Sequence, residues 1–452
     1  MAGETLAKKH CTSCHLYTPP DVLDRTSWLN VLSAMKKEMD LISYPIEYKE
    51  WIDVQRFYLD YSPPVFGTRR LKNDPVEQKL FYSSDIFGSP NEMVNSTMLF
   101  WNAERRSLHV GQESGHVRTF WANKPVATDS ISNIPVDAAV LEDQLLILGM
   151  GTIGPNPQAL GSVYPLGDAN LMVDGLHRPV DMIIDDLDGD READLFVASF
   201  GSKIDSVHSG KLSWFEQSEG YWQEHVLQRL PGAIQVSLAD LDKDGEKEVI
   251  GLFAEAREVI MLYKVVDNEV VSSSEILSFL PIYGTNSFDI TDINDDGLDD
   301  LLVTHGDNDD YSQVFKPYHG VRIFLNKGNL VFEEEFFFPI NGASTVKSAD
   351  FNMDGKMDFV VVAMYPDYFS RPWESVLYFE QGRSNTFKPY FFEQQPSARW
   401  LRIEVADVDS DGDEDLICTS HSGMLGLAPP SLIKSWNSES PGLKVFLNSA
   451  IP

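Results

Sequence analysis

The stretch Asp407-Val408-Asp409-Ser410-Asp411-Gly412-Asp413-Glu414-Asp415 decides how this chain is interpreted, because it occurs five times in register. The copies begin at residues 186, 240, 292, 350 and 407, at intervals of 54, 52, 58 and 57 residues. Positions 1, 3 and 5 of each nine-residue unit are Asp or Asn, and position 9 is Asp or Glu. Gly occupies position 6 in four copies, whereas Arg191 stands there in the first.

This spacing suits a hard cation, and calcium in particular. Calcium takes six to eight oxygen ligands, and a tightly curled loop can turn alternate side chains inward. Gly at position 6 permits the positive φ that the curl needs, so the first loop is expected to be the weakest site. The candidate ligands are positions 1, 3, 5, 7 and 9, namely Asp186, Asp188, Asp190, Glu192, Asp194, Asp240, Asp242, Asp244, Glu246, Glu248, Asp292, Asn294, Asp296, Leu298, Asp300, Asp350, Asn352, Asp354, Lys356, Asp358, Asp407, Asp409, Asp411, Asp413 and Asp415.

These loops differ from those of an EF-hand, although they begin alike. An EF-hand needs a bidentate Glu at position 12 and two flanking helices. Position 12 here is never Glu, and short apolar runs such as Asp358-Phe-Val-Val-Val follow the loops. Such runs are typical of buried strands, so each loop is predicted to join two strands of a hairpin. A solvated acidic turn explains one such loop but not five in register.

A fixed period of this size, with several short strands in each unit, indicates a propeller or a solenoid. Residues 176–450 resemble the FG-GAP or VCBS repeat family, whose repeats form calcium-binding β-propellers. Two units without an aspartate loop, at residues 97–110 and 136–148, precede the five copies. We therefore predict a mainly-β protein with seven blades of four strands. Because the chain ends after a third strand, residues 78–83 are expected to supply the last outer strand.

The N-terminal region carries Cys11-Thr12-Ser13-Cys14-His15. Cys-x-x-Cys-His is the attachment signature of c-type haem: each thiol can add to one vinyl group, and His15 can ligate the iron. A redox dithiol would be expected in a βαβ context, and a zinc site would need a second Cys/His pair nearby. Neither is found in this part of the sequence, so we predict a covalent haem c.

The surroundings of this motif resemble a small all-α cytochrome c. Helices are expected over residues 3–10, from a cap at Thr26 or Ser27 to about Met39, and over 46–61. The predicted inward-facing residues of the last two are Trp28, Leu32, Met35, Met39, Trp51, Val54 and Tyr58. Met/His ligation is the usual cytochrome c arrangement, and residues 28–35 resemble short bacterial cytochromes in which Trp and a Val-Leu pair precede the ligand Met. Met35 is therefore the predicted sixth ligand, with Met39 and His10 as alternatives.

Composition limits the possible partners and surroundings. A net charge of −33 argues against nucleic acid and anionic membrane surfaces. Three cysteines are too few for a disulfide framework, and Cys418 is expected to be a buried, unreactive thiol. There is no run of 18 apolar residues. No signal peptide is evident, so membrane tethering would need a further N-terminal segment.

Together these features predict a haem domain (1–62), a linker with an edge strand (63–90) and a propeller (91–452). The predicted function is electron transfer outside the cytoplasm of a bacterium, in the periplasm, on the outer-membrane surface or in secreted form. The propeller would dock a redox partner protein or a surface polymer. A haem-linked oxidoreductase acting on a saccharide, and an adhesion or carbohydrate-binding protein, remain alternatives. Candidate ligand-pocket residues opposite the calcium loops are His177, Arg178, Tyr283, Asn286, His305, Arg399, Trp400 and His421, of which His305 and His421 are the acid/base candidates.

Overall fold

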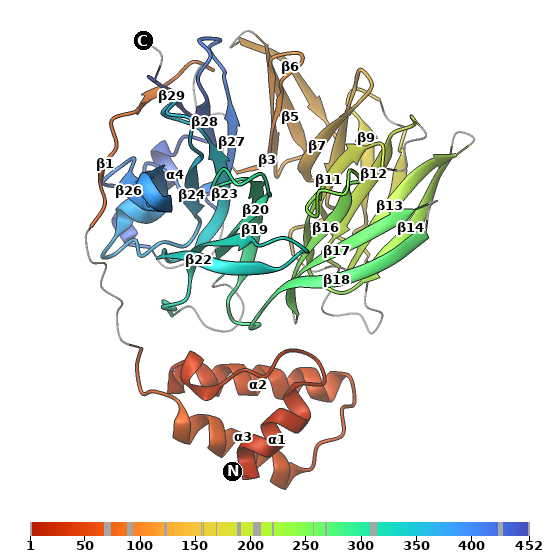
Figure 1. The fold of residues 1–452 in the computed structure, drawn as a ribbon, viewed down its shortest axis with the longest axis vertical. Coiled ribbons are helices and arrows are strands. Elements are labelled where there is room, and N and C mark those ends of the chain that lie inside the picture. Colours follow the sequence, from red (N-terminus) through yellow and green to blue (C-terminus); the bar gives the residue numbers. More distant parts are fainter. Residues whose placement is uncertain are drawn as a thin grey trace.

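The computed structural model describes residues 2–66, 74–87, 93, 95–121, 124–154, 156, 158–168, 170–187, 191–201, 209–218, 221–255, 257–266, 269–307, 314–423 and 428–450. It has a helical region at the N-terminus and a seven-bladed β-propeller (Figure 1). The mainly-β, seven-bladed architecture predicted from the repeats is confirmed.

The helical region contains α1 (Ala2–Cys11), η1 (Pro20–Val22), α2 (Arg25–Leu41) and α3 (Tyr48–Tyr61). Asp24, not Thr26 or Ser27, is the N-cap of α2, so that prediction was wrong. The Asp24 carboxylate accepts hydrogen bonds from the main-chain N–H groups of both residues, which are donors that the start of a helix leaves without partners. The third helix begins two residues later than expected.

The three helices enclose one small apolar core. The inward-facing residues predicted for α2 and α3 are buried, namely Trp28, Leu32, Trp51, Val54 and Tyr58. The ring centroids of Trp28 and Tyr58 lie 4.1 Å apart. Met35 and Met39 pack at the edge of this core and are half-buried.

Seven antiparallel sheets form the blades, and their first strands pack side by side around the axis. Blade 1 consists of β3 (Ser96–Asn102), β4 (Ser107–Gln112), β5 (His116–Trp121) and β6 (Lys124–Ser130). Blade 2 consists of β7 (Pro135–Leu141), β8 (Gln144–Gly149), β9 (Gly161–Pro165) and β10 (Val173–Leu176). Blade 3 consists of β11 (Pro179–Asp185), β12 (Asp194–Ser199), β13 (Lys211–Ser218) and β14 (Tyr221–Arg229). Blade 4 consists of β15 (Ala233–Ala239), β16 (Glu248–Ala254), β17 (Glu258–Val266) and β18 (Glu269–Phe279).

The remaining blades follow the same order. Blade 5 consists of β19 (Thr285–Thr291), β20 (Asp300–His305), β21 (Gly320–Asn326) and β22 (Phe332–Pro339). Blade 6 consists of β23 (Ala343–Ala349), β24 (Asp358–Ala363), β25 (Val376–Gln381) and β26 (Phe387–Phe391). Blade 7 has β27 (Trp400–Ala406), β28 (Asp415–Ser420) and β29 (Leu443–Asn448). The fully buried Cys418 lies in β28, and α4 (Pro430–Glu439), which we did not predict, is inserted after that strand.

The segment between the helices and blade 1 closes the propeller. Strand β2 (Phe81–Ser84) pairs antiparallel with β29 as the outer strand of blade 7, and it overlaps the predicted stretch 78–83. Strand β1 (Val76–Glu77) adds a parallel fifth strand to blade 6 through β26. An N-terminal strand thus joins the C-terminal blade and covers its open edge.

All five aspartate loops join the first and second strands of their blades, so they lie on one face, here called the loop face. The helical region lies against the opposite face. There the Tyr318 hydroxyl, between β20 and β21, donates a hydrogen bond of 2.9 Å to the Val22 carbonyl. Ile282, between β18 and β19, packs against the helical core. The Cys-x-x-Cys-His region and the aspartate loops are therefore on opposite sides of the propeller.

Polar side chains join neighbouring blades near the loop face. The carboxamide of Asn448 in blade 7 donates a hydrogen bond of 2.7 Å to the Phe351 carbonyl in the aspartate loop of blade 6. The corresponding contacts run from Asn326 to Leu241 (2.9 Å) and from Gln381 to Ile293 (2.8 Å). Each aspartate loop of blades 4 to 6 is therefore held by the third strand of the following blade.

Candidate functional site

The aspartate loops curl through left-handed residues, of which the structure describes two in each of the last four loops. Gly245, Gly297, Gly355 and Gly412 at position 6 have φ values of +98°, +89°, +84° and +99°, as the curl was expected to require. Arg191 adopts φ +77° at the same position, a conformation that costs a side chain free energy. Position 4 is also left-handed in the last four loops, at Lys243, Asp295, Met353 and Ser410, which the sequence did not reveal.

Main-chain N–H groups bring the first three ligand positions together. In the loop of blade 5, the Asp296 N–H donates to Asp292 Oδ1 at 3.0 Å and to Asn294 Oδ1 at 3.1 Å, and the Gly297 N–H donates to Asp292 Oδ2 at 2.7 Å. The loop of blade 6 repeats these bonds at Asp350, Asn352 and Asp354. The position-7 residues Leu298 and Lys356 offer no side-chain oxygen, so only their carbonyl groups could serve as ligands.

The position-9 carboxylate lies beneath each loop and is buried in all five. In blade 7, Asp415 Oδ2 accepts from the Val408 N–H at 2.9 Å and Oδ1 accepts from the Asn448 N–H at 2.7 Å. Burial raises the pKa of Asp415 to about 7 and that of Asp300 to about 6. A cation above these groups would relieve the cost of burying their charge.

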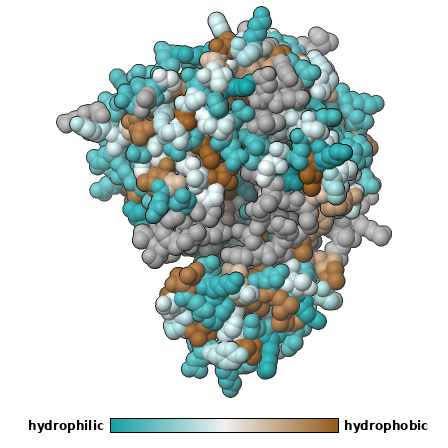
Figure 2. Space-filling model, turned by 180° about the vertical axis from the view of Figure 1, so that it is seen from behind, coloured by the Kyte–Doolittle hydropathy of each residue, from teal (hydrophilic) through white to brown (hydrophobic). Residues whose placement is uncertain are grey.

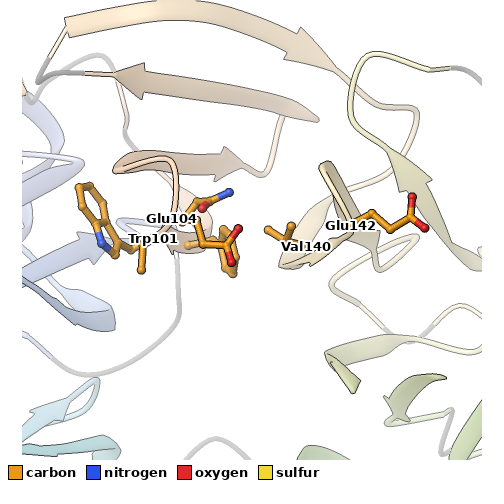
Figure 3. Close-up of a pocket in the computed structure, with 7 residues that line it drawn as sticks. Trp101, Glu104, Val140 and Glu142 are labelled. Atoms are coloured by element: carbon orange, nitrogen blue, oxygen red, sulfur yellow. The ribbon is translucent and has the colours of Figure 1, made fainter. Parts of the chain in front are cut away.

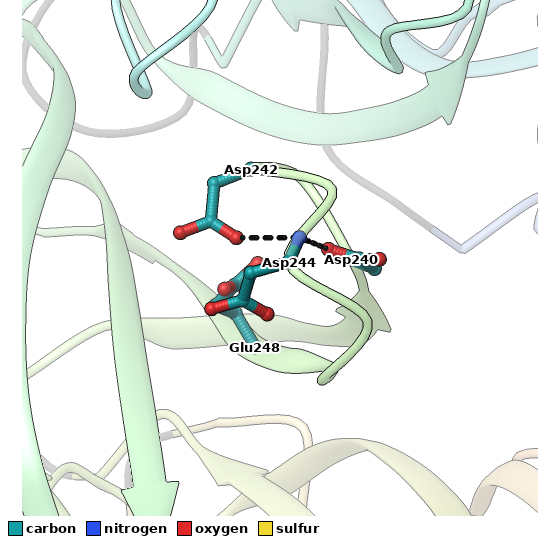
Figure 4. Close-up of side chains that lie close together, drawn as sticks. All are labelled: Asp240, Asp242, Asp244 and Glu248. Atoms are coloured by element: carbon teal, nitrogen blue, oxygen red, sulfur yellow. Dashed lines mark hydrogen bonds between the residues drawn. The ribbon is translucent and has the colours of Figure 1, made fainter.

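Two loops gather several acidic groups within 4.8 Å of one another among the described residues: Asp240, Asp242, Asp244 and Glu248 in blade 4, and Asp407, Asp409 and Asp415 in blade 7. Figure 4 shows the first group around its loop. The oxygen donors of blades 5, 6 and 7 fit calcium, and in blade 6 the Lys356 ammonium also lies 2.8 Å from Asp354 Oδ2. In blade 4, the Lys264 ammonium lies among the carboxylates. Asp188 and Asp190 of blade 3 are outside the described residues.

Cys11, Cys14 and His15 lie where α1 ends. Cys11 is the last helical residue, and the N–H groups of Cys14 and His15 point to its carbonyl at 3.3 and 3.4 Å. The Cys11 side chain is half-buried against the helical core, whereas Cys14 is exposed. Burial raises the pKa of the Cys11 thiol. The two thiols are thus one helical turn apart and differ in solvent access.

The His15 ring is oriented by its own backbone. Its Nδ1 lies 2.7 Å from the Leu16 carbonyl oxygen, an acceptor that selects the tautomer with the proton on Nδ1. Nε2 then carries the lone pair that a metal ligand needs. The donor chemistry of this turn therefore fits a c-type haem.

The alternative axial ligand His10 is held elsewhere. It is 4% exposed, its Nδ1 lies 3.4 Å from the Tyr44 hydroxyl, and its Nε2 lies 3.4 Å from Glu50 Oε2. Met35 and Met39 instead belong to the edge of the same apolar core as Cys11. The two methionines thus lie at the core that Cys11 contacts, whereas the His10 ring faces Tyr44 and Glu50.

The residues expected to form a ligand pocket opposite the loop face do not form one site. Trp400 is 1% exposed and packs in the core of blades 6 and 7, and Arg399 stacks on Trp436 at 5.4 Å. His305 ends β20 in blade 5, whereas His421 follows β28 in blade 7 beside Glu113, at 3.2 Å. The predicted acid/base pairing of the two histidines is therefore not supported.

The other residues of that set have structural contacts. Asn286 donates to the Ala343 carbonyl of the next blade at 2.9 Å, and Arg178 donates to the Ile153 carbonyl at 3.0 Å. Tyr283 stacks on Tyr318, and His177 is half-buried. These contacts indicate that the residues of this set stabilise the fold rather than line a ligand pocket.

A buried polar chain between blades 4 and 5 was missed from the sequence. The Thr285 hydroxyl donates to Glu258 Oε2 at 2.6 Å and lies 2.9 Å from His305 Nδ1. Burial raises the pKa of Glu258 to about 8 and lowers that of His305 well below its usual range. Burial thus favours the neutral form of both groups. No sequence motif marks them, because Thr285 and His305 meet through strand register and Glu258 reaches Thr285 from the neighbouring blade.

The loop face also carries a pocket of about 290 Å³. It lies between blades 1 and 2, where short turns replace the aspartate loops (Figure 3). Its lining combines aromatic and acidic side chains: Phe100, Trp101, Asn102, Ala103, Glu104, Val140 and Glu142. The sequence identified the short turns but not the hollow between them.

Residues 292–361 match the profile of the FG-GAP-like repeat family, in agreement with the resemblance noted above. No match was found among curated protein sequences. Among the described residues, no helix is long and apolar enough to span a membrane.

Several solved propellers are similar in structure. The β-propeller domain of Cps50 (Swd1) from Myceliophteria thermophila has 12% identity and a TM-score of 0.47, covering 78% of this chain and 97% of that one. The WD40 repeats of RRP9 have 10% identity and a TM-score of 0.47, covering 83% and 99%. The WD40 domain of Neurospora crassa Pan2 has 10% identity and a TM-score of 0.46, covering 82% and 97%.

Proposed function

We propose that this chain is an electron-transfer protein that works outside the cytoplasm, in the periplasm, on the outer-membrane surface or in secreted form. Its helical region would hold one covalent haem c, and its calcium-stabilised propeller would dock a redox partner protein or a surface polymer. The observation that carries the proposal is the turn at the end of α1, where Cys11, Cys14 and a correctly oriented His15 come together beside the methionine-edged core.

Each residue of that turn has a distinct part. Cys11 and Cys14 would form the two thioether bonds, and the His15 Nε2 would bind the iron while the Leu16 carbonyl fixes the ring. Met35 is the proposed second axial ligand, with Met39 as its competitor. A haem ligated by His and Met supplies a one-electron carrier of raised potential.

Exposed apolar side chains on the helical region support a haem that is only partly covered by this region and also faces a partner. Leu16 beside the motif is 45% exposed, and Leu41 and Ile42 at the end of α2 are 74% and 60% exposed. Figure 2 shows apolar patches on this region. Apolar side chains of this size are usually covered. A region with only three helices can cover part of a porphyrin and leave an edge for electron exchange.

Calcium is proposed at the aspartate loops as a structural ion. The loops of blades 5, 6 and 7 offer suitable oxygens, and the loop of blade 3 shares their sequence pattern. They lie on the face opposite the helical region, which separates them from the proposed haem. In blade 4 a lysine ammonium contacts three candidate ligands, whereas in blade 6 Lys356 pairs with Asp354, so blade 4 is a separate case.

The test follows the redox state of the purified protein at the visible haem band. Dithionite should reduce it, a small acceptor should re-oxidise it, and saccharides or alcohols alone should produce no steady reduction. Substrate-dependent reduction that is lost in His305→Ala or His421→Ala would favour an oxidoreductase instead. A haem that neither accepts nor releases electrons would contradict the proposal.

A further inference from the structure

The aspartate loop of blade 4 holds a side-chain cation from its own third strand. The Nζ of Lys264 lies 2.6 Å from Asp242 Oδ2, 2.6 Å from Asp244 Oδ2 and 3.1 Å from Glu248 Oε1. The ammonium donates hydrogen bonds to Asp242 and Asp244, and the Glu248 carboxylate completes the group as an ion-pair partner. The Lys264 side chain is only 28% exposed, so these contacts are partly shielded from water.

The corresponding position in the other four blades is never basic. The residue that directly follows each nine-residue loop pairs with an aromatic residue of the third strand. Examples are the pairs Val249–Tyr263 and Leu301–Phe324. The residue after that aromatic is Lys264 in blade 4, and in blades 3, 5, 6 and 7 it is Glu216, Leu325, Glu380 and Leu447. Glu216 and Glu380 bond instead to the fourth strand, through His225 and Tyr390.

A second difference occurs in the same blade. Position 9 is Asp in four loops and Glu only in blade 4, at Glu248. In blades 5, 6 and 7 one oxygen of the position-9 Asp accepts a third-strand N–H, from Asn326, Gln381 and Asn448. In blade 4 the ammonium of Lys264 lies 3.1 Å from Glu248 Oε1. The longer acid and the lysine thus occur together.

We propose that Lys264 takes the place of calcium in the loop of blade 4, so that this loop is charge-balanced by the protein and needs no metal. The carboxylates that would bind calcium at positions 3, 5 and 9 are the three that contact Lys264. Calcium needs six to eight oxygens around one point, and an ammonium among them excludes it by both charge and volume. This inference rests on the proposal that the other loops bind calcium.

The test counts calcium ions per chain by native mass spectrometry at saturating calcium. Lys264→Met, which keeps the length of the side chain but removes its charge, should bind one ion more than the wild type. Lys243→Met is the matched control, because it removes the same charge beside the same carboxylates, from a lysine within the loop. The Lys243 ammonium bonds Asp299 of the next blade at 2.6 Å, so its loss should leave the count unchanged.

A second variant keeps the inference testable if Lys264→Met does not fold. Asp242→Asn/Asp244→Asn in the wild-type background should leave the ion count unchanged, whereas Asp292→Asn/Asp296→Asn in blade 5 should lower it by one. A wild-type count that falls when Asp242 and Asp244 are replaced would overturn the role of Lys264. A wild type that binds no calcium at all, with Lys264→Met binding one ion, would instead refute the calcium proposal for the other loops.

Discussion

The hydroxyl of Tyr318 in the propeller donates a hydrogen bond of 2.9 Å to the main-chain carbonyl of Val22 in the helical region. Tyr318 is itself fixed, because its ring stacks on Tyr283 at 4.9 Å and Arg322 donates to its carbonyl at 2.9 Å. Arg322 also lies over the Tyr283 ring, at 5.0 Å. A rigid aromatic stack of blades 4 and 5 thus holds the helical region on one face of the propeller.

Tyr318→Phe should loosen this docking without unfolding either part. The lost hydrogen bond is worth about 0.5–1.5 kcal/mol, which corresponds to roughly a 2- to 10-fold larger undocked population. Limited proteolysis should release the helical region faster by that factor, while the melting temperature of the propeller stays the same. Tyr221→Phe, at a 79% exposed position of β14, is the control. Equal cleavage rates for all three proteins would show that this contact does not hold the two parts together.

Met35→Ala should remove the sulfur–iron charge-transfer band and lower the haem potential, because a methionine ligand raises it. Met39→Ala should leave both unchanged, since only one sulfur can occupy the sixth position. The two methionines lie on the same face of α2 and are both half-buried, so they form a matched pair. If the band vanishes in Met39→Ala and persists in Met35→Ala, the ligand assignment is reversed.

Much of this architecture could be predicted from the sequence because repetition carries strong information. Five copies of one loop predicted five blades of one type, and the missing outer strand after β29 pointed to residues 78–83. The N-cap at Asp24 was missed because Thr26 and Ser27 have equally good capping side chains. Helix α4 was missed because it is an insertion outside the repeat.

The site could be predicted only in part. Residues close together in the sequence, such as Cys11, Cys14 and His15, were identified correctly as neighbours. Contacts that depend on the register between strands could not be predicted from the sequence. An example is the contact of Lys264 with the carboxylates of the hairpin that precedes it. The candidate pocket residues on the face away from the aspartate loops were wrongly expected to be exposed. Loop position suggested exposure, but strand pairing and neighbouring blades bury Trp400 and His305.

Removing calcium should destabilise the propeller strongly. Each ion that binds the native state alone contributes about 2.7 kcal/mol at one hundred times its Kd, and its loss leaves buried acids such as Asp300 and Asp415 without a counter-ion. A chelator should lower the melting temperature sharply, and calcium should restore it. Asp296→Asn should reduce this calcium-dependent shift, whereas Asp295→Asn, at a non-ligand position of the same loop, should not. Identical melting curves with and without chelator would refute the structural role of calcium.

Glu258 should make the stability of the protein fall as pH rises. Burial raises its pKa from 4.5 to about 8, so between these values the folded state holds a proton that the unfolded state has lost. The free energy of unfolding then decreases with pH across this window, by up to about 1.4 kcal/mol per pH unit, and changes no further above it. Glu258→Gln should flatten the slope measured by urea unfolding between pH 5 and 8 at constant calcium. Glu335→Gln, at an exposed position of β22, should retain the wild-type slope, and a slope that Glu258→Gln leaves unchanged would refute the assignment.

The most direct test of the central claim is the amount of haem that stays attached to the denatured chain after production in cells able to mature c-type cytochromes. The account predicts one haem per chain, resistant to acid-acetone extraction, visible in the pyridine haemochrome spectrum and in the intact mass. The attachment should be lost in Cys11→Ala/Cys14→Ala and retained in Cys418→Ala. A wild-type chain without covalent haem, in cells that load a control cytochrome, would contradict the account.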